Sequence, residues 1–298
     1  MHDHAHDIDK SRRFNNNRRF ALGTGLNVVF VLVEAGCGFY FGSLALLADA
    51  GHNLSDVVGL LLAWGGDYLS RRSPTLDRTY GFRRATILAA LGSSILVILA
   101  VGLVIWEAVE RLLDPSPVSG LPIIVVAGIG VVVNGLTTLL FYSGRKTDLN
   151  VRGAFVHMAA DTGISLGVVI SGLLLLWRDW PWLDPAVGLA VAAVIVVGSW
   201  PFFIDSLNMA LDKVPSSVDP AKVLDYLRGL EGVEDVHDLH IWPMSTRETA
   251  LTVHLVAPDA SRNQLLKQAL HGVEERFSIC HCTIQVEEED LDEELGCL

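Results

Sequence analysis

Two short stretches of the 298-residue chain repeat the same pair of metal-binding side chains at the same spacing. In HNLSD (52–56) and in HMAAD (157–161), a histidine precedes an aspartate by four positions. Residues i and i+4 lie on one face of an α-helix, so each stretch directs an imidazole and a carboxylate the same way. Two imidazole nitrogens and two carboxylate oxygens make a complete tetrahedral set for Zn²⁺. The predicted metal site therefore consists of His52, Asp56, His157 and Asp161.

Both pairs lie in apolar surroundings, because the chain is 51% hydrophobic and only 19% charged, which is typical of a membrane protein. A spanning helix needs about 20 apolar residues. Six segments reach that length: 20–41, 44–69, 86–106, 121–142, 154–177 and 186–206. The helical rise of about 1.5 Å per residue gives the depth of each residue below the end of its span. By this count His52 is predicted to lie level with Asp161, near the bilayer midplane.

A site at that depth favours transport, because ionisable residues inside a bilayer are costly and usually line an ion path. A buried hydrogen bond between helices would explain one such residue, but it does not explain a repeated pair. Metal binding requires neutral imidazole and ionised carboxylate, so protons compete with the metal. We therefore expect metal–proton antiport, with His52 and His157 as the main proton carriers. Asp49, three residues before His52, is predicted to be an accessory residue that supports helix packing or access.

The positive charges predict the orientation. Most Lys and Arg residues of the membrane half lie in the N-terminal arm and in the loops after the second and fourth spans. Positive loops stay cytoplasmic, so both termini are predicted to be cytoplasmic. No signal peptide is evident at the start. The net charge of −12 comes largely from the C-terminal part of the chain, which ends in the acidic run 287–294, and this argues against nucleic acid as a partner.

The last part of the chain predicts a separate domain. Its pattern indicates, in order, a helix, two strands, a helix and a strand: 219–229, 234–242, 248–257, 261–276 and 280–287. Two helices on one face of a three-stranded sheet make an α+β domain like that of small metallochaperones. The predicted organisation is a His/Arg-rich cytoplasmic arm, a six-helix transport domain, a cytoplasmic αββαβ domain and an acidic tail: 1–19, 20–212, 213–290 and 291–298.

The sequence strongly resembles the cation diffusion facilitator family, in its bacterial zinc and cadmium branch. The matching stretches are GSLALLADAGHNLSD (42–56), YGFRRATILAA (80–90), HMAADTGISLGVVI (157–170), DSLNMALDKVP (205–215) and VHDLHIW (236–242). The resemblance implies a homodimer in the cytoplasmic (inner) membrane that exports Zn²⁺ by alternating access in exchange for protons. It places the transport site on the four residues that the spacing selects. The loop 75–84 contains Asp77 but no histidine, so the further loop site of some members is not expected.

The resemblance also implies a metal site in the cytoplasmic domain, where bound Zn²⁺ would be a regulatory ion. Its positions fall on His237, His254, Cys280 and Glu287. Separately from the resemblance, His281, Cys282 and Cys297 are candidate accessory ligands, which with Cys280 and the N-terminal histidines could form a second, weaker site or none. His240 is predicted to face the opposite side of its strand from His237 and to be structural.

Three alternatives accompany this interpretation. An intramembrane metalloenzyme is disfavoured, because no HExxH motif occurs and four protein ligands leave Zn²⁺ no position for a catalytic water. A membrane metal sensor would bind the ion without moving it. A transporter of the same design could carry Cd²⁺ or Co²⁺ as well, or have Fe²⁺ or Co²⁺ as its main substrate.

Overall fold

The computed structural model describes most of the chain: residues 25, 28–115, 118–142, 149–178, 180–258 and 261–289. The predicted arm 1–19 and acidic tail 291–298 lie outside the described residues. Contacts divide the chain into two units, one made of residues 1–61 and 93–201 and the other of residues 62–92 and 202–298. The second unit therefore includes the ends of three long helices together with the C-terminal sheet. The predicted domain boundaries stay a prediction.

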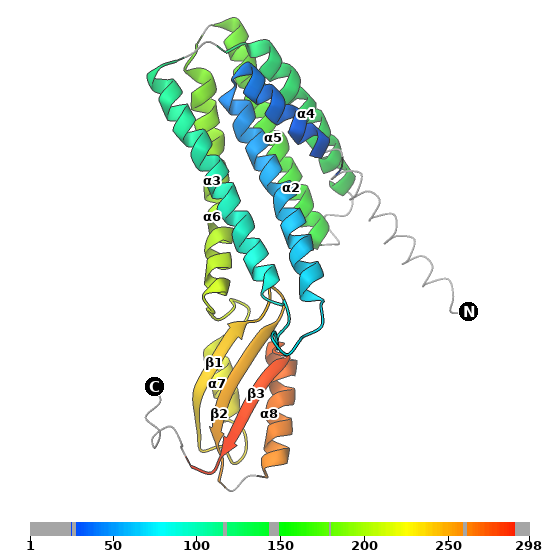
Figure 1. Cartoon of the computed structure of the whole chain (residues 1–298), viewed down its shortest axis with the longest axis vertical. Helices are drawn as coiled ribbons and strands as arrows, with labels where there is room; N and C mark the ends of the chain where they lie inside the picture. The colour runs from blue at the N-terminus through cyan, green and yellow to red at the C-terminus, as the bar shows by residue number, and fades with distance from the viewer. Residues whose placement is uncertain are drawn as a thin grey trace, which may run out of the picture. The chain divides into compact units, whose positions relative to one another are not determined.

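The first unit is helical, as predicted. Its described part begins with the helix Val28–Phe41. Five long helices follow, which Figure 1 shows side by side: α2 (Leu44–Ser70), α3 (Ala85–Leu113), α4 (Gly120–Tyr142), α5 (Leu149–Trp177) and α6 (Leu183–Ala210). Within the described residues, four stretches are long and apolar enough to cross a membrane: Ala85–Leu113, Gly120–Leu139, Met158–Trp177 and Leu183–Ala210. With 27 residues α2 is long enough to span, but its polar residues make it less apolar than these four.

The helices α4 and α5 pack closely because glycines face each other. A Cβ atom added at Gly120 would lie 2.5 Å from the carbonyl oxygen of Gly172. One added at Gly172 would lie 2.8 Å from the side chain of Ile124. Small residues let membrane helices approach in this way. The close contact fixes the position of α5, which carries His157 and Asp161.

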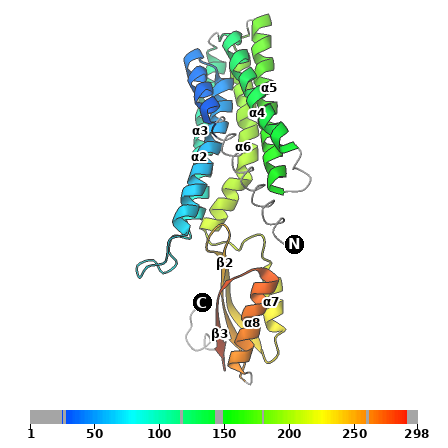
Figure 2. The ribbon, with the colours of Figure 1, turned by 90° about the vertical axis from the view of Figure 1, so that its right-hand side faces the viewer.

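The C-terminal elements form the predicted αββαβ domain. They are α7 (Pro220–Arg228), β1 (Asp235–Pro243), β2 (Thr249–Val256), α8 (Arg262–Phe277) and β3 (His281–Glu287). The strand order is β1-β2-β3, with β1 antiparallel and β3 parallel to β2. Figure 2 shows both helices on one face of the sheet. The core between them is built from alternate strand residues and the inner helix faces: Val223, Leu227, Ile241, Leu251, Val253, Leu255, Leu265, Ala269 and Val273.

A bulge interrupts the first strand. His237 pairs with His254 and His240 pairs with Thr252, so two residues of β1 stand opposite one residue of β2. Asp238, inside the bulge, has a φ of 49°. Directly paired residues project from the same face of a sheet, and the extra residue inverts the alternation. His240 therefore lies on the same face as His237, and the prediction that the two histidines face opposite sides is wrong.

Candidate functional site

Three of the four predicted transport ligands come together between α2 and α5. His52 Nε2 lies 3.2 Å from Asp161 Oδ1 and 3.8 Å from Asp56 Oδ2. One ligand atom from each of the three residues lies within 4.8 Å of the other two. The side chain of Asp161 is 1% exposed, that of His52 18% and that of Asp56 32%, so Asp161 is the most deeply buried of the three. His52 and Asp161 are thus at the same level, as the helical rise predicts.

The fourth predicted ligand is His157, which belongs to α5 one turn before Asp161. Its side chain lies outside the described residues. Its membership of the site therefore stays a prediction, which rests on the i, i+4 relation to Asp161.

Asp49 lies outside the three-residue cluster, in a buried hydrogen-bonded network beside it. Ser165 Oγ donates to Asp49 Oδ2 at 2.8 Å. Asn53 Nδ2 lies 3.4 Å from Asp49 Oδ1 and 3.4 Å from Glu34 Oε2. The side chains of Asp49, Asn53, Ser165 and Glu34 are almost fully buried. The network joins the helix Val28–Phe41 to α2 and α5, the two helices that carry the cluster.

The beginning of α2 is held by a residue that the sequence interpretation missed. The buried carboxylate of Asp184, at the start of α6, accepts hydrogen bonds from Ser43 Oγ and from the backbone amide of Leu44, both at 2.6 Å. Arg111 of α3 donates to the carbonyl oxygen of Gly42. The signal in the sequence was a lone carboxylate at the first turn of an apolar helix. These contacts fix the end of α2 that precedes His52.

A second cluster lies on the outer face of the C-terminal sheet, opposite the helices. His237 Nε2 is 3.3 Å from Glu287 Oε2, and His254 Nδ1 is 3.1 Å from Glu287 Oε1. One ligand atom from each of these three residues lies within 4.8 Å of the other two, close enough for one metal ion to bind all three. Asp238 stands next to them, with Oδ2 3.8 Å from His254 Nε2 and Oδ1 2.7 Å from His240 Nε2. The bulge brings this carboxylate to the cluster, which strand alternation alone does not predict.

Cys280 lies away from the level of this cluster. His281 pairs with Ala250, whereas His254 pairs with Gln285, so Cys280 is five residues, or about 16 Å, from the level of His254. Cys280 is exposed.

His281 and Cys282 make contacts outside this cluster. The ring of His281 makes a T-shaped, edge-to-face contact with the ring of Tyr80, with centroids 5.4 Å apart. Cys282 packs against the core, and burial raises the pKa of its thiol to about 11, which disfavours the metal-binding thiolate at neutral pH. Cys297 lies outside the described residues.

Comparison with known proteins gives matches along nearly the whole chain. The family model of the cation efflux transmembrane domain matches residues 21–209, and that of the cation efflux protein cytoplasmic domain matches residues 215–289. The zinc transporter ZitB of Escherichia coli K12 is 36% identical over 289 residues, which cover 96% of this chain and 92% of ZitB.

Two further relatives are similar over most of their length. A cadmium, cobalt and zinc/H(+)-K(+) antiporter of Bacillus subtilis 168 is 33% identical over 266 residues, or 87% of this chain and 85% of the antiporter. The metal cation efflux system protein CzcD of Cupriavidus metallidurans is 32% identical over 286 residues, or 95% of this chain and 89% of CzcD.

Proposed function

The chain belongs to the cation diffusion facilitator family of cation efflux transporters, and from this premise we propose that it exports Zn²⁺ from the cytosol in exchange for protons. The family consists of metal transporters, so the chain is not an enzyme. In the proposal, Zn²⁺ binds His52, Asp56, His157 and Asp161, and the site opens alternately to the two sides of the membrane.

The observation that carries the proposal is the approach of His52 to Asp161 across two helices. Zn²⁺ bonds to nitrogen and oxygen of about 2.0–2.1 Å place tetrahedral ligand atoms about 3.3 Å apart. The distance of 3.2 Å between His52 Nε2 and Asp161 Oδ1 suits two ligands of one ion. Asp56, at 3.8 Å from His52, needs only a small adjustment to join them. One further nitrogen ligand from His157 would complete the set.

Protons provide the driving ion because they bind the same groups. A histidine that holds a proton cannot bind the metal through that nitrogen, and a protonated carboxylate is a poor ligand. Metal release on one side therefore favours proton uptake there, and the reverse favours metal binding on the other side. The name of the B. subtilis antiporter, which includes protons and potassium, supports exchange. The same name supports Cd²⁺ and Co²⁺ as further substrates.

The proposal also includes the orientation of the protein in the membrane and its oligomeric state. The arginine-rich loop between α2 and α3 supports a cytoplasmic location for both termini. We place the protein in a cytoplasmic membrane as a homodimer, which membership of the family and the match to its cytoplasmic domain support. In the C-terminal domain, His237, His254 and Glu287 would hold a regulatory Zn²⁺ ion. A role for Cys280 in that site stays a prediction.

The test is metal flux into proteoliposomes that contain the purified protein under a pH gradient. We expect Zn²⁺ flux that follows the gradient, and an Asp161→Asn variant that is slower by at least about tenfold, because even residues that merely orient metal ligands contribute that much. Asp114→Asn is the matched control, since Asp114 is exposed at the end of α3. Zn²⁺ binding without flux would favour the sensor alternative, and flux that ignores the gradient would exclude antiport. Faster flux of Fe²⁺ or Co²⁺ than of Zn²⁺ would identify a different main substrate.

A further inference from the structure

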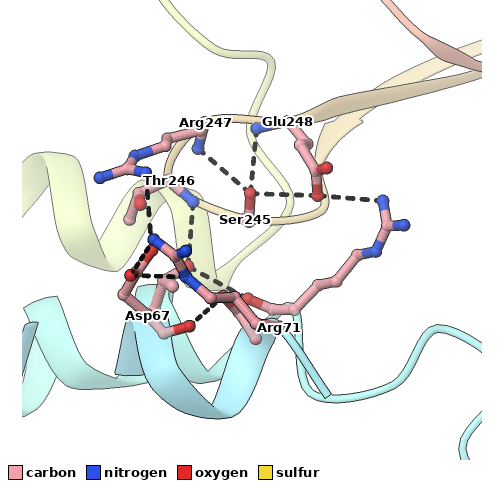
Figure 3. Close-up of polar contacts among 9 residues, drawn as sticks. Asp67, Arg71, Ser245, Thr246, Arg247 and Glu248 are labelled. Carbon is pink, nitrogen blue, oxygen red and sulfur yellow. Dashed lines mark hydrogen bonds and ion pairs between the residues drawn. The ribbon is translucent and has the colours of Figure 1, made fainter. Parts of the chain in front are cut away.

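The turn between β1 and β2 docks on the ends of two long helices within the second unit (Figure 3). Arg247 Nη1 lies 3.5 Å from Asp67 Oδ1 of α2. Glu248 Oε2 lies 3.0 Å from Nη1 of Arg83, just before α3. Between them, the backbone amide of Thr246 donates to Thr86 Oγ1 of α3 at 3.1 Å. We call these three contacts the clamp.

Hydrogen bonds within the turn hold the backbone from which its charged side chains project. Ser245 Oγ accepts hydrogen bonds from the backbone amides of Arg247 at 3.2 Å and Glu248 at 3.0 Å. The backbone amides of Met244 and Ser245 both donate to the carbonyl oxygen of Glu248. Met244 and Ser245 are buried, whereas the two charged residues project outward. The direction of Arg247 and Glu248 is therefore set by the turn itself.

The charges across the clamp are complementary in both directions. The turn offers a cation to the carboxylate of Asp67 and an anion to the guanidinium of Arg83. Asp67 also accepts a hydrogen bond from Arg71 Nη2, directly after the end of α2, at 2.8 Å. A turn shifted along the helices would lose both pairs, so the clamp specifies one register.

The clamp joins elements that carry the two metal clusters. Asp67 follows Asp56 by eleven residues on the continuous helix α2, which corresponds to about 16 Å along the helix axis. The turn closes β1 and β2, which carry His237 and His254. Exposed ion pairs are individually weak and are screened by salt, so the two ion pairs and the Thr246 hydrogen bond must act together to hold the turn.

We propose that Asp67, Arg83, Arg247 and Glu248 are positioning residues for transport. They hold the turn on α2 and α3, so that movement of the C-terminal sheet is transmitted to the helix that carries His52 and Asp56. This inference rests on the proposed function and adds the physical link between the cytoplasmic sheet and the transport site.

Charge reversal and charge exchange test the link in full-length protein in proteoliposomes. Arg83→Glu and Glu248→Arg each place like charges opposite each other, and the double variant restores an opposite pair. We expect each single variant to lower the maximal Zn²⁺ flux by at least about threefold with the KM for Zn²⁺ within about twofold, and the double variant to recover more than about half of the rate. The unchanged KM separates positioning from damage to the metal site.

Arg262→Glu is the matched control, because it breaks another exposed ion pair of the same sheet domain, to Glu288 at 2.6 Å, away from the clamp. Wild-type rates in the control are expected. Wild-type rates in both single clamp variants, or a double variant as slow as the single ones, would overturn the inference while leaving the proposed function intact. No flux in the wild type would overturn both.

Hydrogen exchange gives a readout that does not depend on transport. Thr86→Val keeps the side-chain shape but removes the acceptor for the Thr246 amide. In full-length protein in lipid nanodiscs, exchange of the Thr246 amide should become faster by roughly tenfold, because the turn then opens without its helix contact. Arg262→Glu should leave it unchanged. Equal exchange in wild type and Thr86→Val would show that the turn is not docked and would overturn the inference.

Discussion

Asp184 is distant from the proposed metal ligands, yet it bonds the start of the helix that carries two of them, His52 and Asp56. The first backbone amides of an α-helix have no partner within the helix. In α2, the backbone amide of Leu44 donates to the carboxylate of Asp184, which lies 140 positions later in the chain. An anion at a helix N-terminus also interacts favourably with the helix dipole. The contact therefore links the start of α6 to the start of α2 through a buried, charge-assisted hydrogen bond.

Replacing this carboxylate tests its contribution. Asp184→Asn keeps the shape but leaves one acceptor oxygen where the carboxylate has two, so the bond from Ser43 or that from Leu44 is lost. We expect a destabilisation of about 1–3 kcal/mol, the usual cost of leaving a buried donor unpaired. Thermal unfolding in detergent measures it, with Asp114→Asn as the exposed control. An unchanged unfolding temperature would show that water or another group replaces the carboxylate.

Among the elements, helices were easier to predict than strand registers. The spacing of His52 and Asp56 on α2 follows from the helical period, which does not depend on other segments. Residues on a strand depend on how the neighbouring strand pairs. The bulge at Asp238 changes neither composition nor hydrophobic pattern, so the sequence alone did not reveal that His240 shares a face with His237. The resemblance to the family places Cys280 in the same site, and the register of β3 against β2, which decides its distance from His254, cannot be obtained from that resemblance.

The sheet cluster gives a prediction at this scale, since each of its three residues comes from a different strand. Glu287 approaches both His237 and His254 and is 2% exposed. Glu287→Gln should weaken Zn²⁺ binding to the sheet by at least about tenfold, because an amide is a poorer zinc ligand than a carboxylate. Equilibrium dialysis of the full chain measures this in an Asp161→Asn background, where the transport site is disabled.

The matched control for this measurement is Glu289→Gln, at an exposed carboxylate just after β3. It should bind Zn²⁺ like the parent protein. Equal binding in Glu287→Gln and the parent would mean that the sheet cluster holds no metal. That result would not bear on the proposed transport site in the membrane.

In the whole molecule, the two ends of α3 carry the charge asymmetry that predicts orientation. The loop before α3 contains five arginines: Arg71, Arg72, Arg78, Arg83 and Arg84. The opposite end of α3 carries Arg111 near Glu107 and Glu110, and Arg111 pairs with Glu107. Positive loops are retained in the cytoplasm during insertion. In this orientation the C-terminal domain lies in the cytosol, where its metal cluster would meet the Zn²⁺ that the proposed transporter exports.

Thiol labelling from one side of the membrane tests that orientation. Leu76 precedes α3 and Leu113 ends it, and both side chains are highly exposed at 99% and 83%. In a variant with all native cysteines replaced by serine, a membrane-impermeant maleimide should label Leu113→Cys in intact cells and Leu76→Cys only in inside-out vesicles. The reagent reaches only the aqueous side to which it is added, so each cysteine reports one end of a spanning helix. The reverse pattern would overturn the proposed cytoplasmic location of the C-terminal domain, and labelling of both sites from one side would mean that α3 does not span the bilayer.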